Sequence, residues 1–329
     1  MTDLISFPGL GIELEVNRVA FSLGSIDIYW YAVIIATGFL LAITFAFKNA
    51  KRFGIDEDRI VDVIFFAMIF GIIGARLYYV AFQWDMFKDN LIEILNIRGG
   101  GLGFYGGIIG GALGLIIGCK VRGQKILPFL DLAGGAVLIG QGIGRWGNFV
   151  NSEAFGCNTN LPWGMTSPKI AAYIARHSEE TMGAVMDPNL PVHPTFFYES
   201  LWCAIGLLVF CYVMKKRKFD GQMFLFYLGW NGFGRMLIEG LRTDSLMIGP
   251  FRISQLLGAL MFIFAVCAFR VAMKFLKSEN KPEWLSIFAE TEQGKLVSEG
   301  KWDYKNNCKK SEVSEEKTET EEAENGNDN

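Results

Sequence analysis

The sequence predicts an all-α integral membrane protein with about seven transmembrane helices and a small extracytoplasmic subdomain. Hydrophobic residues make up 51% of its 329 residues, and the mean hydropathy is positive. They gather in apolar runs of bilayer length, and a membrane-spanning helix needs about 20 mainly apolar residues. Clusters of lysine and arginine separate these runs at alternate loops. The predicted spans are residues 28–47, 60–82, 102–119, 127–146, 196–214, 221–240 and 253–276.

Basic residues in the short loops predict the orientation of the chain. Lysine and arginine concentrate in the cytoplasmic loops of membrane proteins, and here they follow the odd-numbered spans. The N-terminus is therefore expected outside the cell membrane and the C-terminus in the cytoplasm. The basic clusters are Lys48, Lys51, Arg52 and Arg59, then Lys120, Arg122 and Lys125, then Lys215, Lys216, Arg217 and Lys218, and finally Lys274 and Lys277.

This topology divides the chain into five segments. Residues 1–27 form an extracytoplasmic N-terminal segment, residues 28–146 hold four spans, and residues 196–276 hold three more. Residues 147–195 are too long for a simple connection, so the extracytoplasmic subdomain is expected there. Residues 277–329 form a cytoplasmic tail that is expected to be disordered toward its end, because eight acids and few apolar residues occur there.

No cofactor, metal or nucleic-acid partner is predicted. The six cysteines are scattered, without the spacing of a zinc site or a disulfide framework. Residues 101–106 and 142–147 match the glycine pattern of a dinucleotide-binding loop. That loop works only between a strand and a helix, and both matches lie in or beside predicted spans. The sequence also lacks a nucleophile elbow and an HExxH motif.

Glycines recur at every fourth position in the third predicted span. Such a row lies on one helix face and lets a neighbouring helix approach closely, so helix packing is its expected role. The glycine-rich segment from Arg98 to Gly107 differs, because a glycine-rich loop before a helix can present backbone amides to an anion. The two rows are Gly106, Gly110, Gly114 and Gly118, and Gly103, Gly107 and Gly111.

Ionisable residues lie in or at the ends of the spans, where charge is costly and usually faces a cavity or a partner. Arg235 and Glu239 are four residues apart and can pair. The excess of arginine could be balanced by a bound anion, and the planar guanidinium suits phosphate. Snorkelling and structural ion pairs are the alternatives for each residue alone. The other polar residues at span depth are Arg76, Arg145, Asn148, Asn151, Glu153, Glu199 and Arg242.

The sequence offers no obvious nucleophilic side chain. His193 could act as a base, but its place before a proline at the start of a span favours a capping or structural role. An enzyme of this kind would orient two substrates, one of which supplies the nucleophile.

Residues 142–156, GIGRWGNFVNSEAFG, resemble the signature of the prolipoprotein diacylglyceryl transferases, G-R-x-G-N-F-x-N-x-E-x-x-G. The resemblance covers residues 20–275 or so, and its motifs occur in the order found in the family. The supporting motifs are Trp30-Tyr31, GARLYYV at 74–80, RGGGLGFYGG at 98–107, HPTFFYES at 193–200 and GRMLIEGLRTD at 234–244.

The resemblance implies transfer of a diacylglyceryl group from phosphatidylglycerol to the lipobox cysteine thiol of a prolipoprotein signal peptide. A thioether forms and glycerol 1-phosphate is released, as the first step of lipoprotein maturation. The resemblance assigns catalysis to Arg145, Arg235, Tyr105 and Glu239. It assigns binding of phosphatidylglycerol to Arg145, Asn148, Asn151, Glu153, Tyr31, Gly100, Gly106 and Arg242.

One position departs from the family pattern. The glycine-rich motif of well-known members reads G-G-x-x-x-H-G-G, and its histidine has been proposed as the base, whereas this chain has Tyr105 there. An unperturbed tyrosine, with a pKa near 10, is a poor base at neutral pH. Either Tyr105 only positions substrate, or the thiol loses its proton to another group or to water, so the base stays unassigned.

Two other functions fit some of these features. A secondary transporter for an anion would also carry intramembrane arginines and glycine-rich helices, but it predicts similarity between the two halves, and residues 28–146 and 196–276 show none. A non-catalytic lipid-binding or scaffold protein would not require so dense a polar cluster at one span end.

Overall fold

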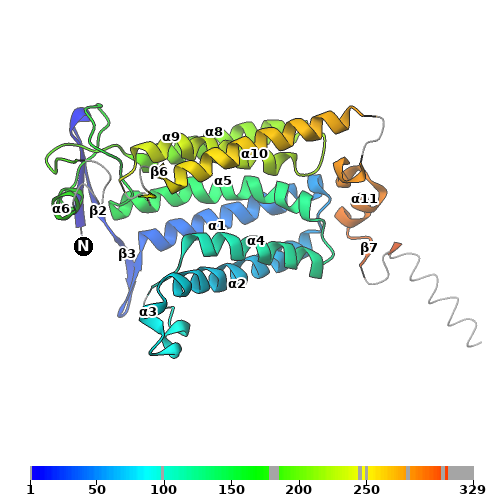
Figure 1. Cartoon of the computed structure of the whole chain (residues 1–329), viewed down its shortest axis with the longest axis horizontal. Coiled ribbons are helices and arrows are strands. Elements are labelled where there is room, and N and C mark those ends of the chain that lie inside the picture. Colours follow the sequence, from blue (N-terminus) through cyan, green and yellow to red (C-terminus); the bar gives the residue numbers. More distant parts are fainter. Residues whose placement is uncertain are drawn as a thin grey trace, which may run out of the picture. The chain divides into compact units, whose positions relative to one another are not determined.

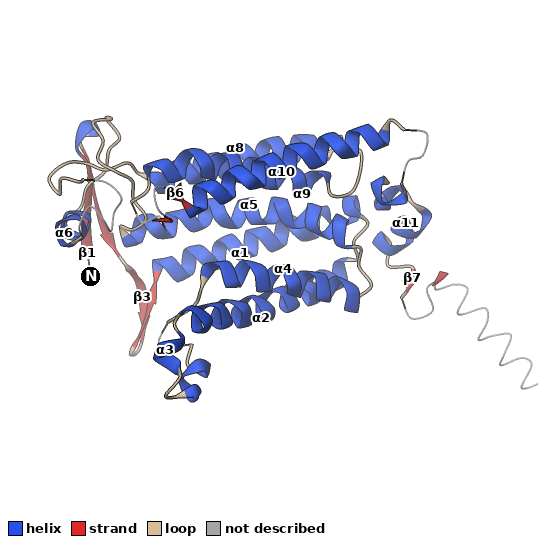
Figure 2. Cartoon of the chain, viewed as in Figure 1, coloured by secondary structure: helices blue, strands red, loops and turns tan. Residues whose placement is uncertain are grey.

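The structure is a computed structural model that describes residues 2–97, 100–177, 185–243, 247–248, 251–278, 282–304 and 308–309. Helices dominate these residues (Figure 2). Arg98, Gly99, Asp244 and the acidic end of the tail lie outside the described residues. The helices are α1 (Trp30–Asn49), α2 (Glu57–Phe82), α3 (Trp84–Phe87), α4 (Phe104–Val121), α5 (Ile126–Asn151), α6 (Pro168–Arg176), α8 (Thr195–Met214), α9 (Gln222–Ile238), α10 (Ile253–Leu276) and α11 (Glu292–Ser298).

Six of the described helices are long and apolar enough to cross a membrane, namely α1, α2, α4, α5, α8 and α10. Each lies within a few residues of a predicted span. The remaining predicted span, residues 221–240, is occupied by α9, which is shorter, with 17 residues. The chain is an all-α, multi-pass integral membrane protein, and the total of seven spans remains a prediction.

The chain forms two compact units, each described here by itself. The first unit comprises Met1–Ala46 and Ala133–Ser286, and the second comprises Phe47–Leu132 and Ile287–Asn329. In the first unit, α8, α9 and α10 run alongside α5 (Figure 1). This bundle places the ends of α5, α8 and α9 next to one another.

A pair of tryptophans locks α8 against α9. The rings of Trp202 and Trp230 stack with centroids 4.4 Å apart. Each indole N–H donates to the main-chain oxygen of the other tryptophan, at 3.0 Å in both directions. Gly206 and Gly234 lie under these rings, and a Cβ at either position would overlap an indole nitrogen. The two glycines therefore allow the close approach of α8 and α9.

We expect Gly206→Ala to destabilise the first unit by about 1–3 kcal/mol, because overpacking a tight contact forces side chains or backbone to shift. Gly140→Ala is the matched control, since a Cβ there meets nothing within 4 Å. Thermal unfolding in detergent, followed by near-ultraviolet circular dichroism of the tryptophans, measures both. Equal unfolding temperatures for the two variants would contradict the expectation.

The extramembrane part of the first unit begins with two β-hairpins that the sequence analysis did not predict. Strands β1 (Thr2–Phe7) and β2 (Ile12–Asn17) pair antiparallel, as do β3 (Val19–Leu23) and β4 (Ile26–Tyr29). Ser6 of β1 also bridges Thr166 in the segment between α5 and α8. That segment forms a small apolar core with the start of α8, made by Phe155, Met165, Ile170, Ile174, Val192 and, from α8, Phe196.

In the second unit, α2 and α4 pack along the first row of glycines. A Cβ at Gly106, Gly110, Gly114 or Gly118 would come within 3.0 Å of an atom of α2. In the second row only Gly103 is as tight, because a Cβ there would lie 2.6 Å from Tyr78 Cδ1, whereas a Cβ at Gly107 or Gly111 would meet atoms of α2 at 3.6 Å or more. The predicted packing role is confirmed for the first row.

The C-terminal segment of the second unit packs on the loops between its helices. The Tyr304 ring lies 3.6 Å under the Arg59 guanidinium, and its hydroxyl accepts a hydrogen bond from Gln124 Nε2 at 2.9 Å. The same ring covers Gly123, whose φ of +67° favours glycine. Burial raises the pKa of Tyr304 to about 12. Tyr304 therefore acts as an anchor for residues 287–309, apart from the undescribed residues 305–307.

Tyr304→Phe is expected to cost about 1–2 kcal/mol, because the hydroxyl accepts a hydrogen bond from Gln124 and donates one to Asp56 at 3.4 Å, and each contributes about 1 kcal/mol. Tyr304→Ala should cost more, about 3 kcal/mol, because the half-buried ring is also lost. Limited proteolysis of residues 287–309 measures the opening of this segment. The alanine variant should be cleaved fastest and the phenylalanine variant at an intermediate rate. Identical cleavage of all three proteins would show that Tyr304 is not an anchor.

Candidate functional site

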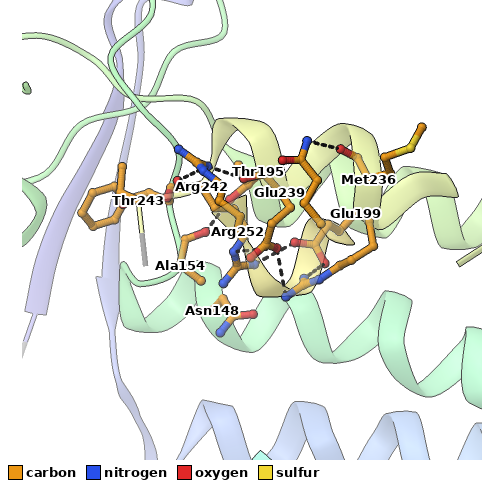
Figure 3. Close-up of polar contacts among 12 residues, drawn as sticks. Asn148, Ala154, Thr195, Glu199, Met236, Glu239, Arg242, Thr243 and Arg252 are labelled. Carbon is orange, nitrogen blue, oxygen red and sulfur yellow. Dashed lines mark hydrogen bonds and ion pairs between the residues drawn. The ribbon is translucent and has the colours of Figure 1, made fainter. Parts of the chain in front are cut away.

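Glu199 is the centre of an arginine cluster in the first unit. It lies in the second turn of α8, and its side chain is 10% exposed. Glu199 Oε2 pairs with Arg145 of α5 and, at 3.4 Å, with Arg235 of α9. Glu199 Oε1 pairs with Arg242 Nη1 at 2.8 Å (Figure 3). One carboxylate thus joins three arginines from three parts of the chain.

A second carboxylate, Glu239, completes the cluster. It follows α9 in a short 3-10 helix (Glu239–Leu241), and its side chain is 2% exposed. Its Oε2 lies 3.1 Å from Arg235 Nη2 and 3.9 Å from Arg242 Nε. The predicted pairing of Arg235 with Glu239 is present in the structure.

Arg252 holds the turn that carries these groups. It ends the short strand β6 (Phe251–Arg252), which pairs with β5 (Met247–Ile248). Arg252 Nη1 donates to the main-chain oxygens of Glu239 and, at 2.6 Å, Arg242 (Figure 3). The turn after α9 is therefore held by a guanidinium group whose contacts are to the backbone.

The cluster carries more positive than negative charge. Three arginines (Arg145, Arg235 and Arg242) pair with two glutamates, so one positive charge is in excess before Arg252 is counted. Arg145 and Arg235 are 25% and 27% exposed, whereas Arg242 is 8% exposed. Arg145 and Arg235 also share one carboxylate oxygen. They are therefore adjacent guanidinium groups that a bound anion can reach.

The end of α5 supplies a chain of polar contacts that leads to Arg145. Arg145 Nη1 lies 3.4 Å from Asn148 Oδ1. The side-chain amides of Asn148 and Asn151 both donate to Glu153 Oε1, at 3.1 and 3.3 Å. The structure thus brings together the four polar residues that the sequence predicted at this end of the helix.

The turn after α5 is held in an unusual backbone conformation. Ser152 and Ala154 have φ values of 50° and 55°, which residues other than glycine adopt rarely. Ser152 Oγ donates to Asp3 Oδ2 at 2.6 Å, and Thr195 Oγ1 donates to the Ala154 main-chain oxygen (Figure 3). Contacts from distant parts of the chain therefore keep Glu153 turned toward Asn148 and Asn151.

Gly156, the last residue of the signature, lets this turn approach the arginines. A Cβ there would lie 2.8 Å from His193 Cβ and 2.9 Å from the Leu241 oxygen. Gly156 also forms a β-bridge with Arg242. Tyr31 of α1 approaches the same helix end, since a Cβ at Gly147 would lie 2.7 Å from its ring. Tyr31 therefore packs beside the predicted lipid-binding residues.

His193 lies beside the site but has its own contacts. Its Nδ1 is 3.1 Å from the Tyr198 hydroxyl, which accepts a hydrogen bond from Trp163 Nε1 at 2.7 Å. Burial lowers the pKa of His193 below its usual value, so the imidazole is neutral at pH 7. These contacts fit the structural role favoured by the sequence.

The remaining predicted site residues, Gly100, Tyr105 and Gly106, belong to the second unit. Their part in a site with Arg145 therefore stays a prediction. Among the described residues, no group of three or more His, Cys, Asp or Glu side chains is arranged to hold a metal.

Two residues of the cluster, Glu199 and Arg252, are not among the site residues predicted from the sequence. The sequence marks Glu199 only as a charge in a span. An acid inside the 20-residue apolar helix α8 was the available signal for Glu199. The signal for Arg252 was weaker, because it lies at the start of a helix, where arginine often serves only as an anchor.

Comparisons with known proteins agree with this geometry. The sequence model of the family described as prolipoprotein diacylglyceryl transferase matches residues 18–271. The phosphatidylglycerol–prolipoprotein diacylglyceryl transferase of Finegoldia magna is 42% identical over 267 residues, covering 80% of this chain and 100% of that protein. Enzymes of the same name from Clostridioides difficile and Enterococcus faecalis are 40% and 43% identical, covering 80% and 77% of this chain and 97% and 89% of theirs.

The family match contains every residue of the arginine cluster and all six long apolar helices except the last residues of α10. The chain belongs to the prolipoprotein diacylglyceryl transferase family.

Proposed function

We propose that this chain transfers the diacylglyceryl group of phosphatidylglycerol to prolipoproteins, the first step of lipoprotein maturation. The observation that carries the proposal is the pair of partly exposed arginines, Arg145 and Arg235, joined through one oxygen of Glu199. This arrangement offers two guanidinium groups to one phosphate, and Arg–phosphate hydrogen bonds are strong and directional.

The reaction follows from that contact. The cysteine thiolate of the lipobox attacks the carbon of the diacylglyceryl group that is bonded to a phosphate oxygen. The new C–S bond forms as the C–O bond to phosphate breaks, and glycerol 1-phosphate leaves. Negative charge grows on the leaving phosphate oxygen, and Arg145 and Arg235 stabilise it. The same positive field lowers the pKa of a nearby thiol, which reduces the need for a strong base.

The buried members of the cluster have a different role. Glu199 and Glu239 hold the arginines in place and keep most of their charge balanced before the lipid arrives. Asn148, Asn151 and Glu153 orient the headgroup beside Arg145. Arg242 and Arg252 support the turn after α9 from the protein side.

The orientation of the chain fits this assignment. The basic residues of the short loops support an orientation with the N-terminus outside and the C-terminus in the cytoplasm. The end of α5 and the start of α8, where the cluster lies, then face the outer side of the cell membrane. A prolipoprotein signal peptide with a lipobox cysteine would present its thiol there.

The direct test uses purified protein, phosphatidylglycerol vesicles and a lipobox peptide. Release of glycerol phosphate and a mass shift of the peptide by one diacylglyceryl group are expected together. A peptide with serine in place of the lipobox cysteine is the control and should gain no mass. If the folded wild-type protein yields neither product, the proposal is wrong, and uptake of anions into proteoliposomes becomes the assay for the transporter alternative.

Tyr105→Phe tests the assignment of the base. We expect this variant to keep more activity than Arg145→Ala, because a phenol is a poor proton acceptor at neutral pH. Initial rates of glycerol phosphate release for the two variants decide the point. Complete loss in both would assign Tyr105 an essential role in proton transfer.

A further inference from the structure

Arg76 is a buried arginine whose side chain donates five hydrogen bonds to the backbone of one loop. It lies in α2 and is 7% exposed. Its guanidinium has five N–H groups, and the structure gives five hydrogen bonds to main-chain oxygens. Nε donates to Ile94 at 2.8 Å, Nη1 donates to Gly100 at 3.0 Å and Gly101 at 2.9 Å, and Nη2 donates to Glu93 at 2.6 Å and Asn96 at 3.0 Å.

These contacts distinguish Arg76 from the arginines of the first unit. All five N–H donors of its guanidinium take part in these short hydrogen bonds, so Arg76 has no donor left for a lipid phosphate. The aromatic ring of Phe87 lies 5.0 Å from the guanidinium carbon, and that of Tyr79 lies 5.9 Å away. Carbonyl dipoles and aromatic faces therefore stabilise its charge. The contacts also exclude snorkelling, which the sequence left open for Arg76.

The bound loop, residues 93–97 and 100–103, is here called the glycine strap. Its end is fixed to α2 by the Gly103 N–H, which donates to the Ala75 oxygen at 2.8 Å. Gly101 has a φ of +77°, and a Cβ there would lie 2.6 Å from Arg76 Nη1 and 2.7 Å from Tyr79 Cε1. Only glycine fits this close approach of the strap to Arg76.

Arg76 also decides which way the peptide groups of the strap face. In a trans peptide the C=O and N–H bonds point in opposite directions. Since the Gly100 and Gly101 oxygens point to Arg76, the N–H groups of Gly101 and Leu102 point away from it. Neither N–H forms a hydrogen bond within the described residues. The strap thus presents free amides on the side opposite Arg76.

The strap leads directly into the first turn of α4, which contains Tyr105. Gly106 packs against the Gly74 oxygen and Tyr78 Cβ, and the rings of Tyr78 and Tyr105 lie 6.4 Å apart. The stretch of α2 from Gly74 to Tyr79 therefore holds both the strap and the start of α4. Arg76 makes five hydrogen bonds from this stretch.

We propose that Arg76 is a positioning residue for the transfer reaction, which fixes the glycine strap and the first turn of α4 without touching the lipid. This inference rests on the proposed function, because it needs Gly100, Tyr105 and Gly106 to take part in the reaction. A displacement of about 1 Å can cost about 10²-fold in rate. Loss of Arg76 should therefore lower kcat more than it changes KM for phosphatidylglycerol.

The test compares Arg76→Lys with wild type in the transfer assay. Lysine keeps the charge but has three donors on a single nitrogen, so it cannot bind five carbonyl oxygens arranged around a planar group. We expect kcat to fall by about 10²-fold with KM for phosphatidylglycerol nearly unchanged. Arg122→Lys, an exposed arginine of the same unit that pairs with Asp62 at 2.6 Å, is the matched control and should keep wild-type kcat.

Hydrogen exchange provides the readout that does not depend on activity. In Arg76→Lys, amides of residues 93–97 and 100–103 should exchange faster while those of α8 keep their protection. The positioning role would be overturned if this variant kept the wild-type kcat. It would also be overturned if amides exchanged faster throughout the chain and the unfolding temperature fell. A wild-type protein without transferase activity would refute the proposed function instead. If the wild type is active and Arg145→Ala is inactive, the proposed function stands, and the Arg76→Lys result then tests the positioning role alone.

Discussion

Arg145→Ala is expected to lower the rate of diacylglyceryl transfer by at least about 10²–10³-fold, the usual cost of removing one group that stabilises charge in a transition state. Arg145 is 25% exposed and shares a Glu199 oxygen with Arg235. It can therefore contact the phosphate and remain paired at the same time. After the substitution, Glu199 still pairs with Arg235 and Arg242, so the protein should remain folded.

Arg145→Lys sharpens this test. Lysine restores the charge but not the planar pair of donors that suits phosphate, so activity should lie between that of wild type and that of the alanine variant. Both variants are measured by glycerol phosphate release and by the mass of the modified peptide, with unfolding temperatures as the check on folding. Full activity in Arg145→Ala would remove this arginine from the mechanism. Full activity in Arg145→Lys would mean that charge alone is needed.

Glu199→Gln should cause the largest loss of stability among substitutions in the cluster. Its carboxylate is 10% exposed and joins three arginines, and removing one partner of a buried ion pair typically costs about 3–5 kcal/mol. The loss should appear as a lower unfolding temperature in detergent. Transfer should fall as well, because Arg145 and Arg235 would repel each other without the shared oxygen.

A second substitution distinguishes the loss of charge balance from other effects of Glu199→Gln on stability. In Glu199→Gln, the buried Arg242 guanidinium loses its close carboxylate partner and keeps only the longer contact with Glu239, at 3.9 Å. Adding Arg242→Gln removes this poorly balanced charge, so part of the lost stability should return. Asp62→Asn makes the same acid-to-amide change in an exposed pair with Arg122, and such pairs contribute about 0–1 kcal/mol. It should unfold close to the wild-type temperature. A double variant that is less stable than Glu199→Gln alone would contradict the role of Glu199 as the balancing charge.

The helices and part of the site were predictable because their signals are local. An apolar run of bilayer length predicts a helix whatever its neighbours are, and six predicted spans coincide with long apolar helices. The i,i+4 spacing of Arg235 and Glu239 predicted their pairing. Asn148, Asn151 and Glu153 lie close together in sequence and meet in the structure.

The N-terminal hairpins could not be predicted from the sequence, because their stability depends on contacts with distant parts of the chain. Residues 1–27 are short and partly polar, and a two-stranded hairpin is marginal by itself. In the structure β1 gains support from Thr166 and from the Asp3–Ser152 hydrogen bond. The C-terminal segment likewise lies beyond the family match, which ends at residue 271, and its anchor at Tyr304 depends on Arg59 and Gln124 far away in the chain.

The sequence by itself therefore determined that this protein spans the membrane, which family it belongs to and which polar residues lie at span ends. Only the tertiary structure decided which charges meet. Glu199 pairs with arginines of α5, α9 and the turn after α9, while Arg76 donates its hydrogen bonds to carbonyl groups of the residues before α4. Helical spacing specifies neighbours within one helix, but the partner of a buried charge is set by the packing of different helices, which brings together groups far apart in the chain.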